Sequence, residues 1–273
     1  MNIMVIGAHP DDPDAMFGGG AMLCREHGHS VCMVSMTNGN AGHHEMRRTE
    51  LAKRRHEEAM AAAKIMDVEY LIMSVNDCEL FPTLENRNML ITEMRKFKPD
   101  LIITHPPCDY HPDHRYTSQL VIDTSYLLIV PAIVPEIRPL TENPFYFFSV
   151  DSPMSNMINA VLPIDRVWNK KVKVWHQHES QMYEWLPWTR KKLDEVPKTE
   201  VEKLKYLSSQ RGARHIKTAN NFRDLLICEF GEGGKSIRYA EGFCTANIGK
   251  KLIQDDLVKS FSLSDFLKIG DFK

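Results

Sequence analysis

The chain has 273 residues, of which 43% are hydrophobic and 26% are charged, and its formal net charge is −2 at pH 7. This composition excludes disordered, collagen-like and disulfide-scaffold proteins and indicates a soluble globular protein with one large core. Because 34 basic residues are balanced by 36 acidic ones, no overall field favours nucleic acid or anionic lipid, and we expect neither as a partner. Nine of the 12 histidines lie in the first 114 residues, which points to that half for chemistry.

The six cysteines are scattered singly, without the paired spacing of a metal ribbon or a secreted disulfide framework. The N-terminal segment lacks the basic region and long apolar run of a signal peptide. No stretch approaches the roughly 18 apolar residues that a membrane-spanning helix needs. The sequence therefore predicts a cytoplasmic protein with reduced thiols and no membrane contact.

The first 104 residues alternate between short apolar runs and segments of helical spacing. The pattern predicts strands over 3–8, 31–36, 68–73 and 100–104, separated by helices over 16–27, 44–66 and 84–97. Strand, helix and strand within about 35 residues form a parallel βαβ unit. Its repetition predicts an α/β fold in which a doubly wound, mostly parallel sheet has helices on both faces.

The second half of the sequence is less regular. Residues 121–134 are apolar enough for a buried helix or a strand, 145–150 resemble a strand, and 167–183 have helical spacing. The Lys-, Arg- and Glu-rich run over 190–214 is typical of a solvated helix. No repeat or long linker interrupts the chain. We therefore expect one domain over 1–273, made of a core over 1–135 and a C-terminal elaboration over 136–273.

Two polar clusters directly follow predicted strands, one over 9–12 and one over 105–114. In doubly wound folds the ligand crevice lies beyond the carboxyl ends of the strands, so the two clusters should meet. Two imidazoles and a carboxylate suit zinc with a fourth position left open, and the candidates are His9, Asp12 and His114. Zinc held in this way acidifies a bound water and polarises a carbonyl, as amide hydrolysis requires.

Other side chains of the same clusters complete a hydrolytic set. Asp11 adjoins a predicted ligand and is a candidate general base. The pair of His111 and Asp113 suggests an imidazole held by a carboxylate, able to stabilise an oxyanion or to protonate a leaving nitrogen.

The motifs Ala8-His9-Pro10-Asp11-Asp12 and His111-Pro112-Asp113-His114 together resemble the AHPDD and HPDH motifs of the PIG-L/LmbE family of zinc-dependent N-acetyl-sugar deacetylases. The resemblance covers most of the chain. It extends to shorter elements similar to the family's, namely Thr37-Asn38-Gly39, Arg55-x-x-Glu58-Ala59, Asp77-x-Glu79-Leu80, Lys98-Pro99-Asp100, His178-x-Ser180-Gln181 and Ala240-Glu241-Gly242-Phe243.

The resemblance implies a Rossmann-like fold that binds one Zn²⁺ per subunit and removes the N-acetyl group from an N-acetylglucosamine-type sugar or conjugate. It also implies a role for each matching residue: metal ligands His9, Asp12 and His114, general base Asp11, intermediate-stabilising His111 oriented by Asp113, and sugar-contacting Arg55 and Asp77. It allows a homo-oligomer, a trimer or a hexamer, and assigns pocket-shaping loops to the C-terminal elaboration.

Simpler interpretations stand beside these. Either motif alone could be a turn whose polar residues cap a helix. A metal-dependent amidase or phosphoesterase would use the same donors, and a non-catalytic sugar-binding scaffold would keep the fold without turnover. The aromatic side chains of Trp175, Trp185 and Trp188 fit core packing better than a sugar-stacking wall. His43 and His44 fit surface structure better than a pocket.

Overall fold

A computed structural model describes residues 1–150, 158–251 and 261–269. Its strands form one eight-stranded sheet in the order β3-β2-β1-β4-β5-β7-β6-β8. Pairing is parallel from β3 through β5 and between β6 and β8, whereas β7 is antiparallel to both of its neighbours. The strands are β1 (Asn2–Gly7), β2 (Ser30–Thr37), β3 (Glu69–Val75), β4 (Leu101–Thr104), β5 (Phe145–Ser149), β6 (Ala160–Pro163), β7 (Ala240–Thr245) and β8 (Phe261–Ser262).

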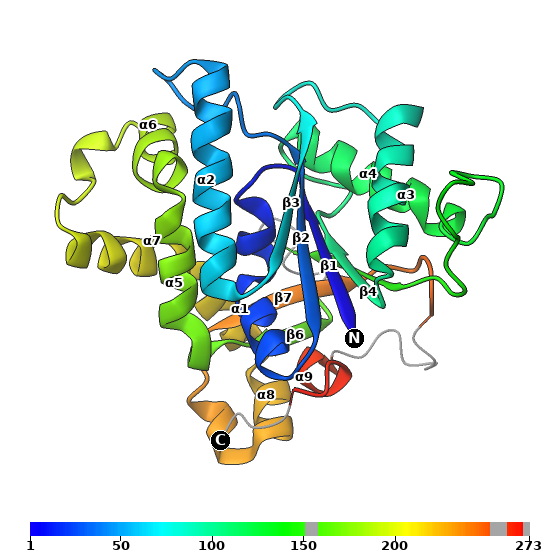
Figure 1. Cartoon of the computed structure of the whole chain (residues 1–273). Coiled ribbons are helices and arrows are strands. Elements are labelled where there is room, and N and C mark those ends of the chain that lie inside the picture. The colour runs from blue at the N-terminus through cyan, green and yellow to red at the C-terminus, as the bar shows by residue number, and fades with distance from the viewer. Residues whose placement is uncertain (151–157, 252–260, 270–273) are drawn as a thin grey trace.

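Helices cover both faces of this sheet (Figure 1). In the first half they are α1 (Asp12–Glu26), α2 (Arg48–Met66), α3 (Leu84–Phe97) and α4 (Pro112–Leu127). In the second half they are α5 (Trp168–Gln177), α6 (Leu186–Thr189), α7 (Glu200–Asn221), α8 (Arg223–Phe230) and α9 (Leu263–Phe266), with a π-helical turn over Ser180–Trp185 and 3₁₀ turns at Asp165–Val167, Leu193–Glu195 and Gly231–Lys235. No helix among these described segments is long and apolar enough to span a bilayer.

The alternation of side chains along β1 explains the layers. Ile3 and Val5 join the hydrophobic cluster that contains residues of α1, α2 and α5, whereas Met4 and Ile6 join the cluster that contains residues of α3 and α4. Successive strand residues point to opposite faces, so a strand apolar throughout is covered on both. The predicted doubly wound α/β fold is thus confirmed.

The order of the strands determines where a ligand can lie. β1 is hydrogen-bonded to β2 on one side and to β4 on the other, and Ile6 is paired with Thr104 near their carboxyl ends. The chain leaves β1 toward α1 and leaves β4 toward α4, which lie on opposite faces. Such a reversal of direction opens a crevice at the carboxyl ends of the two strands, where both polar clusters begin.

The structure corrects several predicted boundaries. The helix predicted over 44–66 begins only at Arg48, and the apolar stretch 121–134 is helical only to Leu127. The helix predicted over 167–183 ends at Gln177, before the separate π-helical turn. The solvated helix predicted over 190–214 begins only at Glu200. In each case the apolar or charged pattern of the sequence runs past the residue at which the helix begins or ends.

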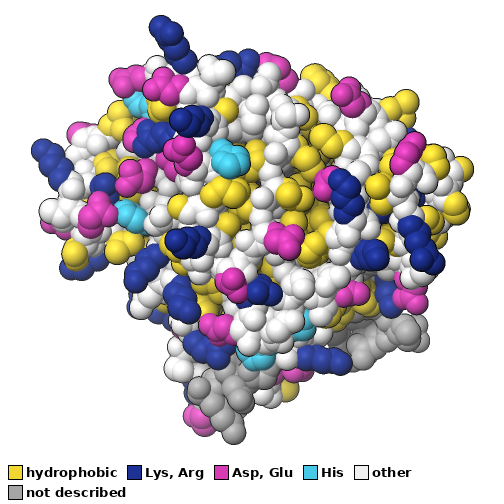
Figure 2. Space-filling view, viewed as in Figure 1, with side chains coloured by type: hydrophobic (Ala, Val, Ile, Leu, Met, Phe, Trp, Pro, Cys, Tyr) yellow, Lys and Arg dark blue, Asp and Glu magenta, His cyan; other side chains and the backbone are white. Residues whose placement is uncertain are grey.

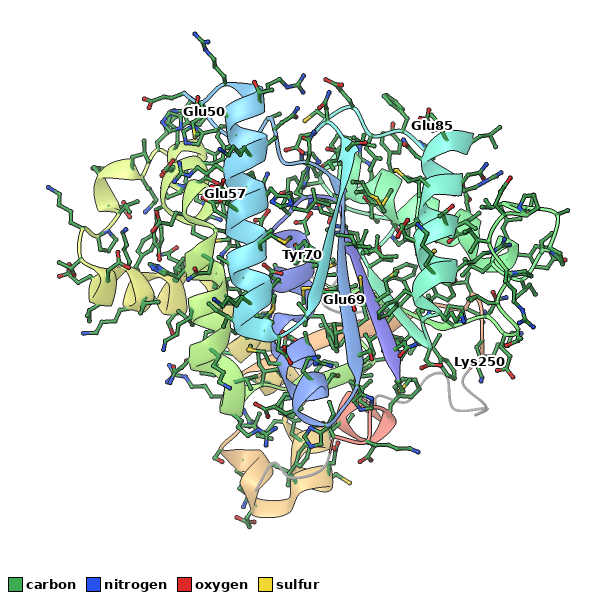
Figure 3. All side chains as sticks on the ribbon, in the orientation of Figure 1. Glu50, Glu57, Glu69, Tyr70, Glu85 and Lys250 are labelled. Carbon is green, nitrogen blue, oxygen red and sulfur yellow. The ribbon has the colours of Figure 1, made fainter. Side chains whose placement is uncertain are left out.

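The surface drawn in Figure 2 mixes basic and acidic side chains over the face that α2 crosses, as the near-neutral total charge predicts. On α2 itself, Glu50 and Glu57 lie on the solvent side of the helix (Figure 3), whereas Arg55 and Glu58 are buried on its inner side. The helix α2 therefore has charged side chains on its solvent side and on its buried side. Only the buried ones are relevant to the site described below.

The C-terminal half contacts the first helix through charges that are fully buried. Glu241 of β7 accepts hydrogen bonds from the amides of Gly19 and Gly20 at 2.9 and 3.0 Å and pairs with the ammonium of Lys171 on α5. A Cβ built on Gly19 would lie 2.7 Å from a methyl carbon of Ile164 and 2.9 Å from Glu241. The lack of a side chain at Gly19 therefore lets α1 pack closely against Ile164 and Glu241.

A buried arginine closes the other face. Arg95 of α3 is 1% exposed and donates six hydrogen bonds, 2.5 to 3.1 Å long, to backbone carbonyls of Leu127, Leu128, Val130, Ile133, Val134 and Ile137. The last carbonyls of a helix have no intrahelical partner, and a cation there is favourable. Arg95 therefore ends α4 and holds the irregular segment that follows it.

We expect Arg95→Met to lower the free energy of unfolding by about 3–5 kcal/mol, because it removes six hydrogen bonds made by a buried cation, although four of the six carbonyls also accept backbone amides. Lys96→Met is the matched control, since the neighbouring Lys96 is exposed and, among the described residues, pairs only with Glu93. It should change stability by no more than about 0.5 kcal/mol. Urea denaturation of the two variants measures the difference, and equal stabilities would contradict this role for Arg95.

Candidate metal centre

Both sequence motifs lie where a strand gives way to the first turn of a helix. The residues after β1 lead into α1, whose N-cap is Asp11, and those after β4 lead into α4, whose N-cap is His111. Proline in the first turn of each helix has the φ angle that a helix start requires. The positive ends of two helices therefore converge on this edge of the sheet, where they favour carboxylates.

Three predicted ligands form a compact triangle. Nδ1 of His9 lies 3.1 Å from Oδ2 of Asp12 and 3.3 Å from Nε2 of His114, and that Nε2 lies 3.4 Å from the same Asp12 oxygen. Ligand atoms bound tetrahedrally to zinc at about 2.0–2.1 Å stand roughly 3.3–3.4 Å apart. The triangle therefore has the size of three corners of a zinc tetrahedron.

Each of the two imidazoles has a carboxylate on its far nitrogen. Nε2 of His9 is 3.2 Å from Oδ2 of Asp113, and Nδ1 of His114 is 2.9 Å from Oδ1 of Asp109. A carboxylate in this position fixes the tautomer and orientation of a metal-binding histidine, and it makes the nitrogen that faces the metal more basic. The arrangement around both rings is that of ligands already turned toward one centre.

The ionisation of these groups indicates that the centre favours positive charge. Burial lowers the pKa of His9, but Asp12 and Asp113 together raise it to about 10. Burial likewise opposes the charged form of His114, yet Asp12 and Asp109 raise its pKa. The carboxyl of Asp12 has a pKa well below its usual range because the surrounding histidines outweigh its burial. Carboxylates that draw protons onto neighbouring imidazoles would equally attract a divalent cation.

A further histidine lies close by but is held differently. Nε2 of His105 is 3.3 Å from Asp12, and its ring stacks on that of His114 with centroids 4.0 Å apart. The same Nε2 accepts a hydrogen bond from the amide of Ala8 at 3.1 Å, which uses the lone pair that a metal would need. His105 therefore supports the loop after β1, whereas His114 is free to face the centre.

The contact expected between His111 and the Asp113 carboxylate is not the one that forms. Oδ2 of Asp113 is 4.0 Å from His111 and is engaged instead by His9 and by the amide of Cys78 at 2.7 Å. The amide of Asp113 donates to Nδ1 of His111 at 3.2 Å. Neutral His111 then carries its proton on Nε2, and its pKa is lowered by burial and by His9 and His114. His111 is thus arranged as a neutral hydrogen-bond donor.

The remaining predicted residues are buried behind the centre. Arg55 pairs with the carboxylate of Asp11 and lies 3.5 Å from that of Asp77, which also accepts hydrogen bonds from Thr37 at 2.6 Å and Gly39 at 2.7 Å. Arg55 is 2% exposed and Asp77 is 3% exposed. Arg55 therefore bridges the carboxylates of Asp11 and Asp77, and the expected contact of Arg55 and Asp77 with sugar stays a prediction.

Sequence reasoning did not select three other residues at the centre. Asp109 holds His114, and the signal was available because a carboxylate lay within the same 105–114 cluster. The ring of Tyr110 is exposed and lies 5.8 Å from that of His111, but one aromatic residue in a loop gives no sequence signal. Cys78 has a φ of 65°, and only the folded chain brings it to Asp113.

Other side chains singled out in the sequence lie outside this centre. Trp175 is in the core, as expected, whereas Trp188 is 44% exposed and stacks on His44 with centroids 5.1 Å apart. His43 contradicts the expected surface position, since its side chain is 4% exposed and lies 2.7 Å from Glu184. His178, in the second half of the chain, is fully buried and pairs with the fully buried Asp14 of α1. The His178-x-Ser180-Gln181 element therefore contacts the first helix. From β3, the Tyr70 hydroxyl, labelled in Figure 3, donates to the Pro10 carbonyl.

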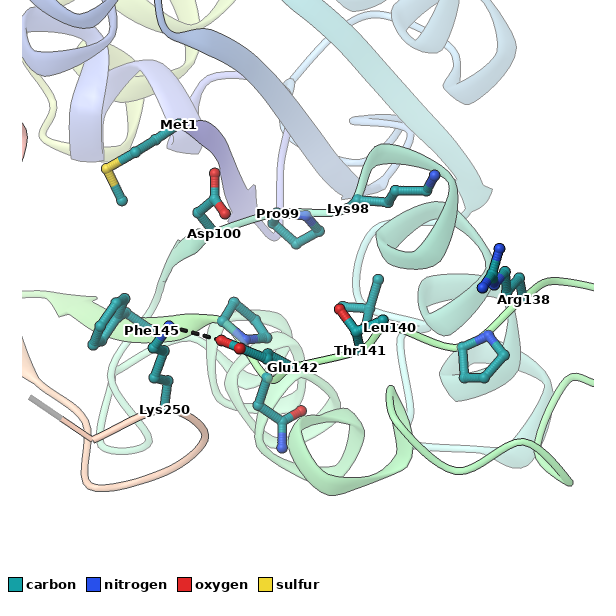
Figure 4. Close-up of a pocket in the computed structure, with 13 residues that line it drawn as sticks. Met1, Lys98, Pro99, Asp100, Arg138, Leu140, Thr141, Glu142, Phe145 and Lys250 are labelled. Carbon is teal, nitrogen blue, oxygen red and sulfur yellow. Dashed lines mark hydrogen bonds and ion pairs between the residues drawn. The ribbon is translucent and has the colours of Figure 1, made fainter.

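A cavity lies at the opposite end of the strands. It has a volume of about 700 Å³ and is lined by residues that include Met1, Asp100, Phe145 and Lys250 (Figure 4). Met1 precedes β1, and Asp100 precedes β4, so this cavity faces the amino ends of these strands. Its Lys250 already pairs with Glu142 at 2.8 Å. Volume alone therefore does not locate the chemistry in this fold.

The chain is similar to several known proteins. Residues 4–125 match the family described as PIG-L: GlcNAc-PI de-N-acetylase. A diacetylchitobiose deacetylase from Thermococcus kodakarensis is 28% identical over 204 residues, which are 69% of this chain and 74% of that protein. Among solved structures, N,N′-diacetylchitobiose deacetylase from Pyrococcus horikoshii has a TM-score of 0.71 at 21% identity and covers 90% of this chain and 83% of its own. The 4-carboxy-2-hydroxymuconate hydratase from Pseudomonas putida KT2440 also has a TM-score of 0.71, at 18% identity, and covers 93% and 98%.

Proposed function

Since residues 4–125 match the PIG-L family, we propose that the protein is a zinc-dependent hydrolase that removes the acetyl group from an N-acetylglucosamine-type sugar or conjugate. The family and its deacetylase relatives support the reaction class. The observation that carries the proposal is the triangle of His9, Asp12 and His114, and a second carboxylate, that of Asp11, directly precedes Asp12 in the sequence. A site of this construction has both a place for a cation and a base for water.

The donors fit a zinc ion better than a hard cation. Two imidazole nitrogens and one carboxylate oxygen are the ligands of many catalytic zinc sites, whereas magnesium and calcium prefer oxygen alone. When bound by His9, Asp12 and His114, the ion would acidify a water molecule and polarise the acetyl carbonyl. The carboxylates of Asp109 and Asp113 would keep the two imidazoles in place.

Asp11 and His111 supply the proton chemistry in this proposal. The Asp11 carboxylate accepts the proton of the attacking water and later delivers it to the departing amine nitrogen, so the acetyl C–N bond breaks and acetate and a free amine form. His111, with its proton on Nε2, donates a hydrogen bond to the oxygen on which negative charge develops. Arg55 and Asp77 hold the Asp11 carboxylate from behind.

The hydratase among the structural neighbours defines a second candidate, the addition of water to an unsaturated carboxylated substrate. Its TM-score equals that of the deacetylase neighbour, so the fold does not separate the two. The charge of the centre favours an N-acetylated sugar over a carboxylated substrate. Carboxylates of Asp11, Asp77 and Asp113 gather there, and the guanidinium of Arg55 is already paired with two of these three. Such a site repels a polycarboxylate more than an uncharged sugar.

The test is release of acetate and free amine from a panel of N-acetylglucosamine monosaccharides, disaccharides and glycoconjugates. We expect release by zinc-loaded protein, and loss of release after chelation that zinc restores. Parallel assays test the two alternatives: phosphate release from phosphoesters tests a phosphoesterase, and water addition to unsaturated dicarboxylates tests a hydratase. Activity in either of those assays, without acetate from any member of the panel, would refute the deacetylase proposal.

A further inference from the structure

A second group of metal-binding side chains lies next to the centre and includes a thiol. Donor atoms of Cys78, His111 and Asp113 all lie within 4.8 Å of one another. Cys78 follows Asp77 in the loop after β3, and the other two residues belong to the first turn of α4. Two segments far apart in sequence thus bring sulfur, nitrogen and oxygen donors close together.

The loop holds the thiol firmly although the side chain is exposed. Cys78 has a φ of 65°, a conformation that favours glycine, and its amide donates to Asp113 at 2.7 Å. On one side, Asp77 is anchored by Thr37 and Gly39, and on the other, Leu80 is buried in the core. The Cys78 backbone therefore has little freedom, and the thiol can reach its neighbours by rotation of one side-chain bond.

One carboxylate oxygen of Asp113, a member of this group, has no partner in the described part of the chain. Its side chain is 1% exposed, and while Oδ2 is engaged by His9 and Cys78, Oδ1 has no hydrogen-bond partner among the described residues. A buried carboxylate oxygen without a partner is costly, and a bound cation would satisfy it. This orphaned oxygen is independent of the thiol and itself points to a ligand.

We propose that Cys78, His111 and Asp113 form a second metal site that takes a soft or borderline divalent cation such as Zn²⁺. On binding, the Cys78 S–H bond breaks, its proton passes to solvent, and a sulfur–metal bond forms. The resulting thiolate and the Asp113 carboxylate balance the two positive charges of the ion, with neutral His111 as the third ligand. Nδ1 of His111 exchanges its 3.2 Å hydrogen bond from the Asp113 amide for the metal.

The size and chemistry of the group support a soft ion. Donor atoms bound to one zinc at about 2.0–2.3 Å stand roughly 3.3–3.8 Å apart. The three donors here lie within 4.8 Å of one another, so they would move closer together when the ion binds. Thiolate sulfur selects zinc-like metals over magnesium or calcium. The triangle of His9, Asp12 and His114 contains no sulfur, and this difference allows the two sites to be told apart by spectroscopy.

The experiment titrates metal-free protein with Co²⁺ and follows thiolate-to-cobalt charge-transfer absorption in the near ultraviolet. Wild type should bind two equivalents and show the sulfur band for one of them. Cys78→Gly, which suits the positive φ, should bind one equivalent without the band and bind the second more than about tenfold more weakly. Cys108→Ser, in which another exposed cysteine is changed, should keep both equivalents and the band.

A wild-type protein that binds a single equivalent, or a sulfur band that survives in Cys78→Gly, would overturn the proposal. Loss of the band in Cys108→Ser with retention in Cys78→Gly would assign the thiolate elsewhere and overturn it as well. None of these readouts requires turnover. Failure to release acetate from any sugar would therefore leave this result standing, and failure of the second site would leave the proposed hydrolase intact.

Discussion

Replacement of Asp11 by asparagine should lower kcat/KM for acetate release by about 10²- to 10⁴-fold while zinc stays bound. The amide keeps the size of the side chain but cannot accept the proton of the attacking water. Asp11 is not a corner of the triangle of His9, Asp12 and His114, so the metal content of Asp11→Asn should equal that of wild type. Activity and zinc per chain are measured on the same preparation.

The Asp11 variant also disturbs an ion pair, because Asp11 holds Arg55. Thermal unfolding therefore accompanies the kinetics, and Glu57→Gln on the solvent side of α2 is the matched loss of a carboxylate. We expect Glu57→Gln to behave as wild type. A folded, zinc-loaded Asp11→Asn protein with activity within tenfold of wild type would show that another group is the base.

Replacement of His114 by alanine should remove the metal, whereas replacement of His105 by glutamine should leave it bound. Both rings lie within 3.4 Å of Asp12 and stack on each other, so proximity does not separate them. Their hydrogen bonds distinguish the two histidines. Nε2 of His105 accepts a hydrogen bond from the Ala8 amide, whereas Asp109 orients His114 through the nitrogen that faces away from the centre. Since loss of an orienting carboxylate already weakens metal affinity about 10- to 100-fold, loss of the ligand itself should exceed 100-fold.

Competition with a chelator of known zinc affinity measures this difference. Glutamine at 105 can still accept the Ala8 amide through its side-chain oxygen, so His105→Gln is a folded control in which only the imidazole is lost. Equal weakening in the two variants, or a stronger effect in His105→Gln, would place the metal between Asp12 and His105 instead. Acetate release should follow the zinc content in both proteins.

The parts of this molecule that the sequence predicts are those determined by local pattern. The strand before His9 and the strand before His105 are apolar runs ended by polar residues, and their order along the chain implies a parallel sheet. From that order it follows that His9, Asp12 and His114 meet. This prediction required no knowledge of any particular contact. The structure does bring the loop after β1 and the loop after β4 together.

What could not be predicted depends on contacts between distant elements. Arg55 lies in a run of charged residues typical of a solvated helix, and only the packing of α2 against the sheet buries it beside Asp11. The carboxylate of Asp113 is in reach of His111 along the chain, yet it turns to His9 and Cys78. β6 and β7 were not predicted because short strands without alternation give no distinct signal, and antiparallel pairing joins them.

The contacts that seat α1 bear on how the metal motif could be moved to another protein. The matched segment ends at residue 125, but the buried Asp14 carboxylate is neutralised by His178, and the amides of Gly19 and Gly20 are satisfied by Glu241. A transplanted segment would expose these groups or bury them unpaired, and each broken buried pair costs about 3–5 kcal/mol, against about 5–15 kcal/mol for the stability of a whole domain. A graft must therefore include the strand and helices that carry the partners, because the smallest portable unit is larger than the sequence motif.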